Sequence, residues 1–264
     1  MSLPRTNVFR FKQFAVIQEQ SAMKVGTDGV LLGAWVSLSD AEPPGRILDI
    51  GTGTGVIALM MAQRTDTLSG TAVVDAVEAD IPAGEEAARN FASSPWASRL
   101  RVYVMPVQQY AAAYGEAEKY SLIVSNPPYF MAGTDFRRGF DTSAAASQPG
   151  PARVAARHAE MLPYDDLIGA VLALLHPDGR FAAIFPYREA GIFIAKAAAR
   201  GLFVRRLLEV RGAPHKPVKR VAVELSLHRP AREEVVRETL CIEDGQGNFT
   251  EAYRGLTRDF YLKF

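Results

Sequence analysis

Residues 46–59 read Arg-Ile-Leu-Asp-Ile-Gly-Thr-Gly-Thr-Gly-Val-Ile-Ala-Leu, in which one apolar run passes through three alternating glycines into a second apolar run. This order predicts a buried strand, a glycine-rich turn and a helix. Glycine lets a backbone approach a ligand closely, and the first turn of a helix offers N–H donors that have no partner within the helix. The stretch therefore predicts a ligand-binding turn in an α/β fold.

The remainder of the core repeats this alternation of apolar runs and helical patterns, which is typical of βαβ units around a parallel sheet. Strands are expected at 46–50, 72–78, 100–105, 121–125 and 180–185, and helices at 55–64, 82–91, 108–114, 164–175 and 189–200. Two further strands, 202–210 and 218–228, are joined by a short link that predicts an antiparallel hairpin at the sheet edge. The expected fold class is α/β, a doubly wound, seven-stranded, mostly parallel sheet with a C-terminal antiparallel hairpin.

The chain is expected to form one domain with two additions to its core. We assign a single domain, 1–264, an N-terminal extension, 1–40, that covers the ligand site, a core, 46–264, and a substrate loop, 129–163. An apolar stretch in the extension predicts a helix that begins at Thr27 or Asp28, because both are good N-cap residues. The loop is long, and loops of such length within a compact domain are usually functional or disordered.

Composition excludes several classes of protein. The 264 residues are 48% hydrophobic and 22% charged, which is ordinary for a globular chain. No apolar run approaches the roughly 20 residues of a membrane span, and residues 1–20 lack the apolar core of a signal peptide. The one cysteine and four scattered histidines show neither disulfide nor zinc spacing. We therefore expect a cytoplasmic protein with no membrane association and no metal.

The glycine-rich turn differs from two common nucleotide-binding motifs. Counting from Gly51, the position where G-x-G-x-x-G needs its last glycine holds Val56, and no Gly-Lys-Ser/Thr follows. Asp49 gives instead D-x-G-x-G, which resembles the first motif of class I methyltransferases. That resemblance implies a turn against the amino-acid part of S-adenosyl-L-methionine, with the acid holding its ammonium group. Glycine turns also occur for packing alone, which is the alternative interpretation.

An acid follows the second expected strand. Glu78 at its carboxyl end is placed to accept both ribose hydroxyls of a nucleoside in a bidentate contact, and Asp80 is the fallback. A solvated strand-end acid with no ligand is the other interpretation.

The motif Asn126-Pro127-Pro128-Tyr129 directly follows the expected strand 121–125. An adenine amine attacks a methyl donor only when its lone pair is freed from the ring, and two hydrogen-bond acceptors achieve this. The Asn126 side-chain carbonyl and the Pro127 backbone carbonyl supply them, and the prolines hold that carbonyl rigidly. Tyr129 then offers a ring face on which an extruded base stacks, and Phe130 either helps or packs.

Five segments resemble the bacterial tRNA(Val) adenine-N6 methyltransferases, which modify the adenosine 3′ of the anticodon. They are 9–14, 22–35, 47–63, 125–129 and 253–262, spread over nearly the whole chain. The resemblance implies a Rossmann-like class I methyltransferase, S-adenosyl-L-methionine as cofactor, tRNA as partner, and a 24–32 block that covers the cofactor. The expected cofactor-binding residues are Lys24, Gly26, Thr27, Asp49, Gly51, Thr52, Gly53, Gly55, Glu78, Ala79, Gln108 and Asn126.

One position departs from that family. It tends to carry an acid after the third strand for the adenine amine of the cofactor, whereas this chain reads Met105-Pro106. Gln108 is the expected substitute. For the 24–28 residues, the alternative interpretation is helix capping and a surface lysine.

Basic residues gather in two places although the net charge is only +1. The window 205–220 holds six Lys or Arg against one Glu, a net +5, and a second cluster lies in the substrate loop. Such clusters neutralise phosphates near a base-flipping site. The expected RNA-contacting residues are Asp28, Phe130, Arg137, Arg138, Arg157, His158, Lys216, Lys219 and Arg220. The alternative is a hairpin whose charges only keep a sheet edge soluble.

Other functions remain open at this point. A glutamine side-chain amide fits the same acceptors, as in release-factor methyltransferases, although those usually carry an N-terminal helical domain. Guanine N2 of rRNA and adenine N6 of DNA also fit. A non-catalytic nucleotide-binding or RNA-binding module and a nicotinamide oxidoreductase are the other classes, and the displaced third glycine disfavours the latter. The oligomeric state stays open.

Overall fold

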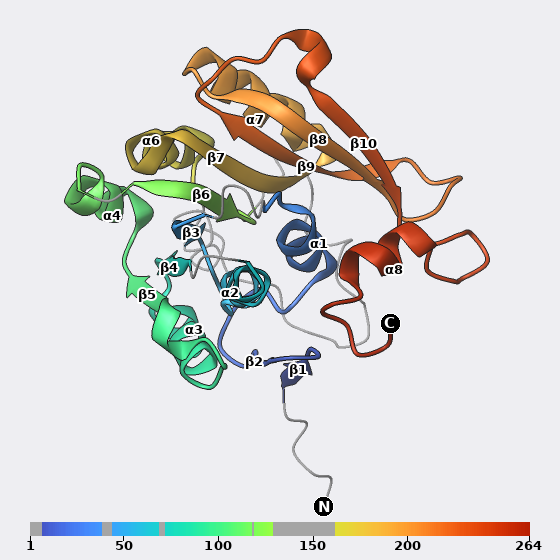
Figure 1. Cartoon of the computed structure of the whole chain (residues 1–264), viewed down its shortest axis with the longest axis horizontal. Helices are drawn as coiled ribbons and strands as arrows, with labels where there is room; N and C mark the ends of the chain where they lie inside the picture. The colour runs from blue at the N-terminus through green and yellow to red at the C-terminus, as the bar shows by residue number, and fades with distance from the viewer. Residues whose placement is uncertain (1–6, 39–43, 69–71, 118, 129–161) are drawn as a thin grey trace, which may run out of the picture.

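The computed structural model describes residues 7–38, 44–68, 72–117, 119–128 and 162–264. Its centre is an eight-stranded sheet in the order β10-β8-β9-β7-β6-β3-β4-β5 (Figure 1). The strands are β3 (Arg46–Ile50), β4 (Val73–Glu78), β5 (Leu100–Val104), β6 (Tyr120–Ser125), β7 (Leu175–Pro186), β8 (Phe203–Arg211), β9 (Val218–Ser226) and β10 (Val236–Cys241). Strands β3 to β7 are parallel, so the expected mostly parallel α/β fold is confirmed.

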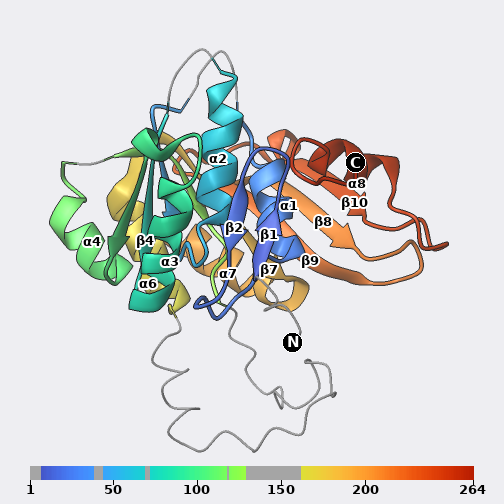
Figure 2. The same cartoon turned by 90° about the horizontal axis from the view of Figure 1, so that it is seen from below.

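Helices cover both faces of the sheet. One face packs against α1 (Thr27–Trp35), α2 (Val56–Asp66), α3 (Ile81–Ala92) and α8 (Glu251–Thr257). The other packs against α4 (Val107–Tyr114), α6 (Tyr164–Leu174) and α7 (Tyr187–Ala199). Figure 2 shows α1 and α2 side by side. Side chains of a strand alternate between faces, so Ile47 joins the first core and Leu48 the second.

Burial on both faces explains why β3 reads as a nearly continuous apolar run. The chain order places β4 and β5 on one side of β3, and β6 and β7 on the other. The direction of winding therefore reverses between β3 and β6. Open α/β sheets bind ligands at the carboxyl ends of the strands that flank such a reversal.

The prediction of seven strands is wrong by one. β10 pairs in parallel with β8, so the β8–β9 hairpin lies inside the sheet and β10 forms its edge. The sequence of β10, Val-Arg-Glu-Thr-Leu-Cys, buries only Leu240, and an edge strand with exposed charges carries little of the apolar pattern by which strands are recognised.

Two local expectations also need correction. Residues 176–179, expected as a turn, belong to β7 and form an irregularity between the partners of Tyr120 and Leu122. Helix α1 begins at Thr27 as expected, but its N-cap is Gly26 and no side chain caps it. Asp28 instead forms an ion pair with Arg220, which removes it from the capping role.

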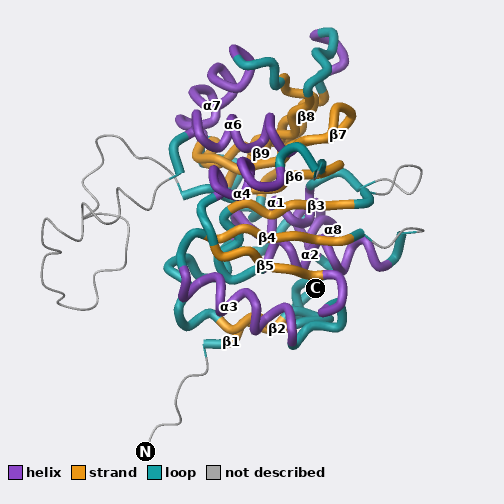
Figure 3. Tube along the Cα trace, turned by 90° about the vertical axis from the view of Figure 1, so that its left-hand side faces the viewer, coloured by secondary structure: helices purple, strands orange, loops and turns teal. Residues whose placement is uncertain are grey.

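The N-terminal residues form a small sheet of their own, β1 (Val8–Arg10) and β2 (Ala15–Ile17). Figure 3 shows β2 alongside α3, and the two elements are in contact. The C-terminal segment closes over β1, because Phe11 forms a β-bridge with Tyr261. The Lys12 ammonium also donates to the carbonyl oxygens of Arg258 and Phe264 at 2.6 and 2.7 Å. The extension is thus packed onto the core.

Among the helices of the described residues, none is both long and apolar enough to cross a bilayer. Over the same part of the chain, no group of three or more His, Cys, Asp or Glu side chains is arranged to hold a metal ion. Of the expected substrate loop, 129–163, only the last two residues are described.

Candidate active site

The turn after β3 owes its shape to three glycines. Gly51, Gly53 and Gly55 have φ angles of 69°, 54° and 82°, a region that favours glycine. At Gly55 a Cβ atom would come within 2.5 Å of the Phe91 ring, so a side chain there is also blocked sterically. At Gly51 a Cβ atom would meet nothing within 4 Å. This turn therefore packs on one side and faces open space on the other.

Asp49 is fully buried beneath the turn. Its Oδ2 accepts hydrogen bonds from the Thr52 hydroxyl at 2.6 Å and the Ala58 amide at 3.2 Å, which fix the turn to the start of α2. Its Oδ1 has no hydrogen-bond partner among the described residues. Burial raises the pKa of Asp49 to about 7, although the bonds from Thr52 and Ala58 oppose the shift. A buried carboxyl oxygen without a hydrogen-bond partner, such as Asp49 Oδ1, is suited to a nearby cationic group.

Glu78 ends β4 beside the same turn and is half-buried. Its Oε2 accepts from the Gly53 amide at 2.8 Å, and its Oε1 from the Asp80 amide at 3.0 Å. Each carboxylate oxygen has a second lone pair, so these bonds leave acceptor capacity for ribose hydroxyls. Asp80, the alternative acid for the ribose, instead caps α3, because its side chain accepts a hydrogen bond from the Ala83 amide at 3.1 Å.

Two apolar side chains at this edge were missed from the sequence. Ile81, which follows Glu78 and the exposed Ala79, is 62% exposed, and Val104 at the end of β5 is 39% exposed. Exposed aliphatic side chains at the carboxyl ends of two adjacent strands suit the face of an aromatic ring. The sequence could have indicated them by position, because Ile81 follows the acidic residues at the end of β4 and Val104 ends β5.

Asn126 lies at the end of β6, next to β3. Ser125 is the register partner of Ile50, and its hydroxyl donates to the Ile50 carbonyl oxygen at 2.8 Å. Asn126 is half-buried, Pro127 is buried and Pro128 is exposed. The Asn126 motif and the glycine turn thus leave adjacent strands at one edge, where the winding reverses. Tyr129 and Phe130 lie outside the described residues.

Helix α1 reaches this edge from the extension. A Cβ atom at Gly29 would lie 3.9 Å from Asn126 Nδ2, so α1 passes close to the motif. Lys24, before the helix, donates from Nζ to the carbonyl oxygen of Gln18 at 2.6 Å, which ties residues 18–24 into a loop. The expected residues Gly26 and Thr27 sit at the helix start.

A buried acid and amide on α3 hold the extension in place, and sequence analysis missed both. Glu86 Oε2 accepts from the amides of Glu19 and Gln20, the latter at 2.7 Å, and its Oε1 accepts from the Ser21 amide at 3.0 Å. Asn90 bonds Ile17 in both directions.

Asn90 also donates to the Thr54 carbonyl oxygen at 2.9 Å, which links the extension to the glycine turn. Ser21 Oγ lies 3.3 Å from the position of a Cβ at Gly53. The available signal was the helical spacing, because Glu86 and Asn90 share the apolar face of α3 with Ala83 and Ala87.

The remaining expected residues are spread more widely. Gln108 is exposed at the start of α4, where it donates to Asp166 at 3.0 Å. Lys216, on the link between β8 and β9, and Lys219, the second residue of β9, are both exposed. Arg220 is paired with Asp28 at 2.6 Å, so these two expected RNA contacts partly neutralise each other. The expected residues Arg137, Arg138, Arg157 and His158 lie outside the described residues.

Comparison with known proteins supports a methyltransferase. The family model described as methyltransferase small domain matches residues 31–143. A tRNA1(Val) (adenine(37)-N6)-methyltransferase of Trichodesmium erythraeum is 43% identical over 98% of this chain and 99% of its own. Relatives with the same name from Dickeya chrysanthemi and Bacteroides fragilis are 41% and 40% identical, over 98% and 97% of this chain and 95% and 98% of their own. This chain belongs to that family.

Solved structures agree with the fold of this tRNA1(Val) (adenine(37)-N6)-methyltransferase family member. A protein of Agrobacterium tumefaciens described as a predicted O-methyltransferase superposes with a TM-score of 0.60 at 20% identity, covering 88% of this chain and 96% of that one. A SAM-dependent methyltransferase of the same organism gives 0.55 at 14% identity, covering 86% and 72%. The chain therefore has the fold of class I methyltransferases, the SAM-dependent class to which its family belongs.

Proposed function

We propose that this chain transfers a methyl group from S-adenosylmethionine to N6 of an adenosine in tRNA, the adenosine beside the anticodon of tRNA(Val). The observation that carries the proposal is the shared edge, where Asn126 and the glycine turn leave the adjacent strands β6 and β3. The names of relatives at 37–43% identity agree with it. A tRNA substrate agrees with the cytoplasmic location expected from the sequence.

The residues at this edge fit the cofactor. Gly51 opens onto free space, and the buried Asp49 has an acceptor oxygen with no partner among the described residues, which suits the ammonium group of an amino acid. Glu78 retains lone pairs for ribose hydroxyls, and Ile81 and Val104 flank the edge for an adenine ring. When bound there, S-adenosylmethionine supplies a methyl group activated by a sulfonium.

Asn126 and Pro127 prepare the acceptor amine. The Asn126 Oδ1 atom and the Pro127 carbonyl oxygen each accept one N6–H, which turns the nitrogen lone pair toward the methyl carbon. With S-adenosylmethionine bound, its methyl group would pass to N6 as the carbon–sulfur bond breaks, and the nitrogen would then shed one proton to solvent. No strong base is required, because the amine becomes acidic once it carries the methyl group. The rate comes from positioning and aligned acceptors.

The test is tritium transfer from labelled S-adenosylmethionine into separate pools of total tRNA, rRNA, DNA and protein from a strain that lacks the enzyme, followed by nucleoside and amino-acid analysis. We expect label in N6-methyladenosine. Label in N2-methylguanosine, in DNA or in a protein glutamine would show that the same acceptors serve one of the other substrates considered above. An absence of label in every pool, with cofactor binding intact, would favour a non-catalytic module.

Cofactor binding is expected to depend on pH through Asp49, whose pKa is raised to about 7 by burial. An ammonium group favours the ionised acid, so affinity rises with pH and binding releases a proton. Between pH 6 and pH 7, where an α-amino group stays mostly protonated, the ionised fraction of an acid with a pKa near 7 increases about fivefold, and affinity follows it. Calorimetry in buffers of different ionisation enthalpy measures both quantities. A flat profile, or proton uptake at pH 7, would contradict the assigned role.

The same shift has an opposite effect on the protein without ligand. The pKa of Asp49 in the folded chain is above the ordinary value of 3.8. Between about pH 4 and 7, Asp49 is therefore protonated in the folded chain and ionised in the unfolded chain. The contribution of Asp49 to stability is therefore present below pH 4 and is lost as pH rises through 7.

Charge reversal at Lys216 of the β8–β9 link and Lys219 at the start of β9 is expected to affect RNA binding more than chemistry. Lys216 and Lys219 are exposed, so Lys216→Glu with Lys219→Glu replaces attraction to phosphates by repulsion. We expect KM for tRNA to rise at least tenfold while kcat changes less than threefold. Steady-state kinetics at two salt concentrations measure this. A large fall in kcat with unchanged KM would assign the lysines to another role.

A further inference from the structure

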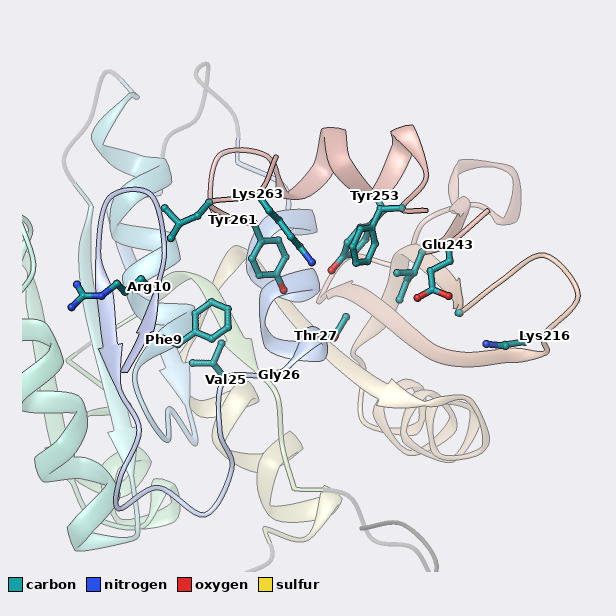
Figure 4. Close-up of a pocket in the computed structure, with 14 residues that line it drawn as sticks. Phe9, Arg10, Val25, Gly26, Thr27, Lys216, Glu243, Tyr253, Tyr261 and Lys263 are labelled. Carbon is teal, nitrogen blue, oxygen red and sulfur yellow. The ribbon is translucent and has the colours of Figure 1, made fainter. Parts of the chain in front are cut away.

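A cavity of about 710 Å³ lies outside the site described so far, between segments that are far apart in the sequence (Figure 4). Its wall includes Phe9 of β1, Thr27 at the start of α1, Lys216 of the β8–β9 link, and Tyr261 of the C-terminal segment. None of Asp49, Glu78 and Asn126 lines it, although Gly26 and Thr27, two of the expected cofactor-binding residues, do. We call it the aromatic groove.

Aromatic rings and the Lys263 cation lie close together in the aromatic groove. Phe9, Phe249 and Tyr261 line it and are half-buried, so each presents part of its ring to the cavity. The Lys263 ammonium lies 4.1 Å from the centre of the Phe249 ring and 5.8 Å from that of Tyr261. In Figure 4 the side chains of Lys263 and Tyr261 both extend toward the cavity. A planar base and a phosphate would find their partners side by side here.

The charge of the aromatic groove is positive. Its charged lining residues are Arg10, Lys216, Lys263 and Glu243, a net +2. The three cations are exposed, whereas Glu243 is half-buried. Rings flanked by cations are the combination that binds unpaired nucleic acid, because bases stack on the rings while Lys and Arg neutralise the backbone. The volume is within the range of about 300–1,000 Å³ that holds drug-sized ligands, so a nucleotide fits.

The aromatic groove adjoins the site of methyl transfer. Thr27 lines the groove, and Gly29, two residues later in α1, approaches Asn126 with 3.9 Å between its Cβ position and Nδ2. Two residues of a helix span about 3 Å along its axis. The first turn of α1 therefore forms a shared wall, with the proposed methyl-transfer site on one side and the groove on the other.

We propose that the aromatic groove binds an unpaired nucleotide that flanks the target adenosine in the RNA. This inference rests on the proposed function and adds where the substrate is held outside the catalytic edge. A base extruded toward Asn126 leaves its neighbours unstacked, and stacking one of them on Phe9 or Tyr261 compensates for the lost contact. Residues of both chain termini thereby act as positioning residues for RNA.

The test measures binding of a fluorescein-labelled 17-nucleotide anticodon stem-loop of tRNA(Val) by anisotropy. The variant is Arg10→Glu with Lys263→Glu, which changes two exposed side chains. The matched control is Arg232→Glu with Arg237→Glu, the same charge change at exposed residues that do not line the groove. We expect Kd to rise at least tenfold for the first and less than threefold for the second. For the groove variant, the negative slope of log affinity against log salt concentration should become less steep by about 1.4, because two single-strand phosphate contacts are lost.

A second variant, Phe9→Leu, keeps an apolar side chain but removes the ring face. We expect its Kd for the stem-loop to rise about fivefold or more, with S-adenosylmethionine affinity unchanged. If the wild-type protein methylates tRNA but the groove variants and the control have equal Kd values for the stem-loop, the inference about the groove is overturned and the proposed function stands. A wild-type protein that binds S-adenosylmethionine but neither binds the stem-loop nor methylates tRNA would overturn the proposed function first.

Discussion

Replacement of Asn126 by Ala is expected to lower kcat for methyl transfer to tRNA by at least 10²–10³-fold, about the effect of removing one preorganised hydrogen-bonding group from an active site. Asn126 directly follows β6, beside the glycine turn, and its loss leaves the Pro127 carbonyl oxygen as the one remaining acceptor of the two in the proposed mechanism. Single-turnover kinetics at saturating tRNA isolate the chemical step. Affinity for S-adenosylmethionine, measured by calorimetry, should stay within a few fold.

The conservative variant Asn126→Asp sharpens this prediction. It retains an acceptor oxygen at the same place but brings a charge, so its rate should lie between those of wild type and Asn126→Ala. A rate for Asn126→Ala within tenfold of wild type would remove the two-acceptor mechanism. A parallel loss of cofactor affinity would instead assign Asn126 to binding.

Replacement of Glu86 by Ala is expected to lower the free energy of unfolding by about 2–4 kcal/mol. The carboxylate is fully buried and accepts three successive backbone amides of residues 19–21, and bonds to charged groups contribute about 1.5–3 kcal/mol each without being additive. Affinity for S-adenosylmethionine should fall as well, because the held segment places Ser21 against the glycine turn. Urea unfolding and calorimetry measure the two effects.

Glu85→Ala is the matched control for Glu86→Ala. It makes the same change one residue earlier in α3, at an exposed position. We expect its stability to change by less than about 0.5 kcal/mol, as for most surface substitutions. Hydrogen exchange should show amides 19–21 exposed only in Glu86→Ala. Equal stability of the two variants would mean that the extension is held by Asn90 and the C-terminal contacts instead.

The edge that carries the proposed chemistry could be predicted from sequence because each of its parts follows a recognisable strand. Asp49 and the three glycines come after β3, and Asn126 comes after β6, so chain order alone placed them at carboxyl ends. Their adjacency depends on the sheet order as well, which the alternation of strands and helices alone does not give.

Contacts between distant segments could not be predicted in the same way. The ion pair of Asp28 with Arg220 joins residues 192 positions apart, and no periodicity encodes it. Arg206, counted in the basic window, bonds Glu238 and stacks on Trp35 at 4.3 Å. The positive charge that the window 205–220 offers to RNA is therefore smaller than the net +5 counted from the sequence, because the Arg206 charge is paired. The aromatic groove was missed for the same reason, since both termini build it.

The most direct test of the central claim is a crystal structure with S-adenosylhomocysteine and a stem-loop that carries the target adenosine. We expect the sulfur and the adenine amine to meet at the shared edge of β3 and β6, with N6 within hydrogen-bond distance of Asn126 Oδ1 and the Pro127 carbonyl oxygen. A complex in which the cofactor occupies the glycine turn but its sulfur points away from Asn126, or in which the adenosine binds elsewhere, would contradict it.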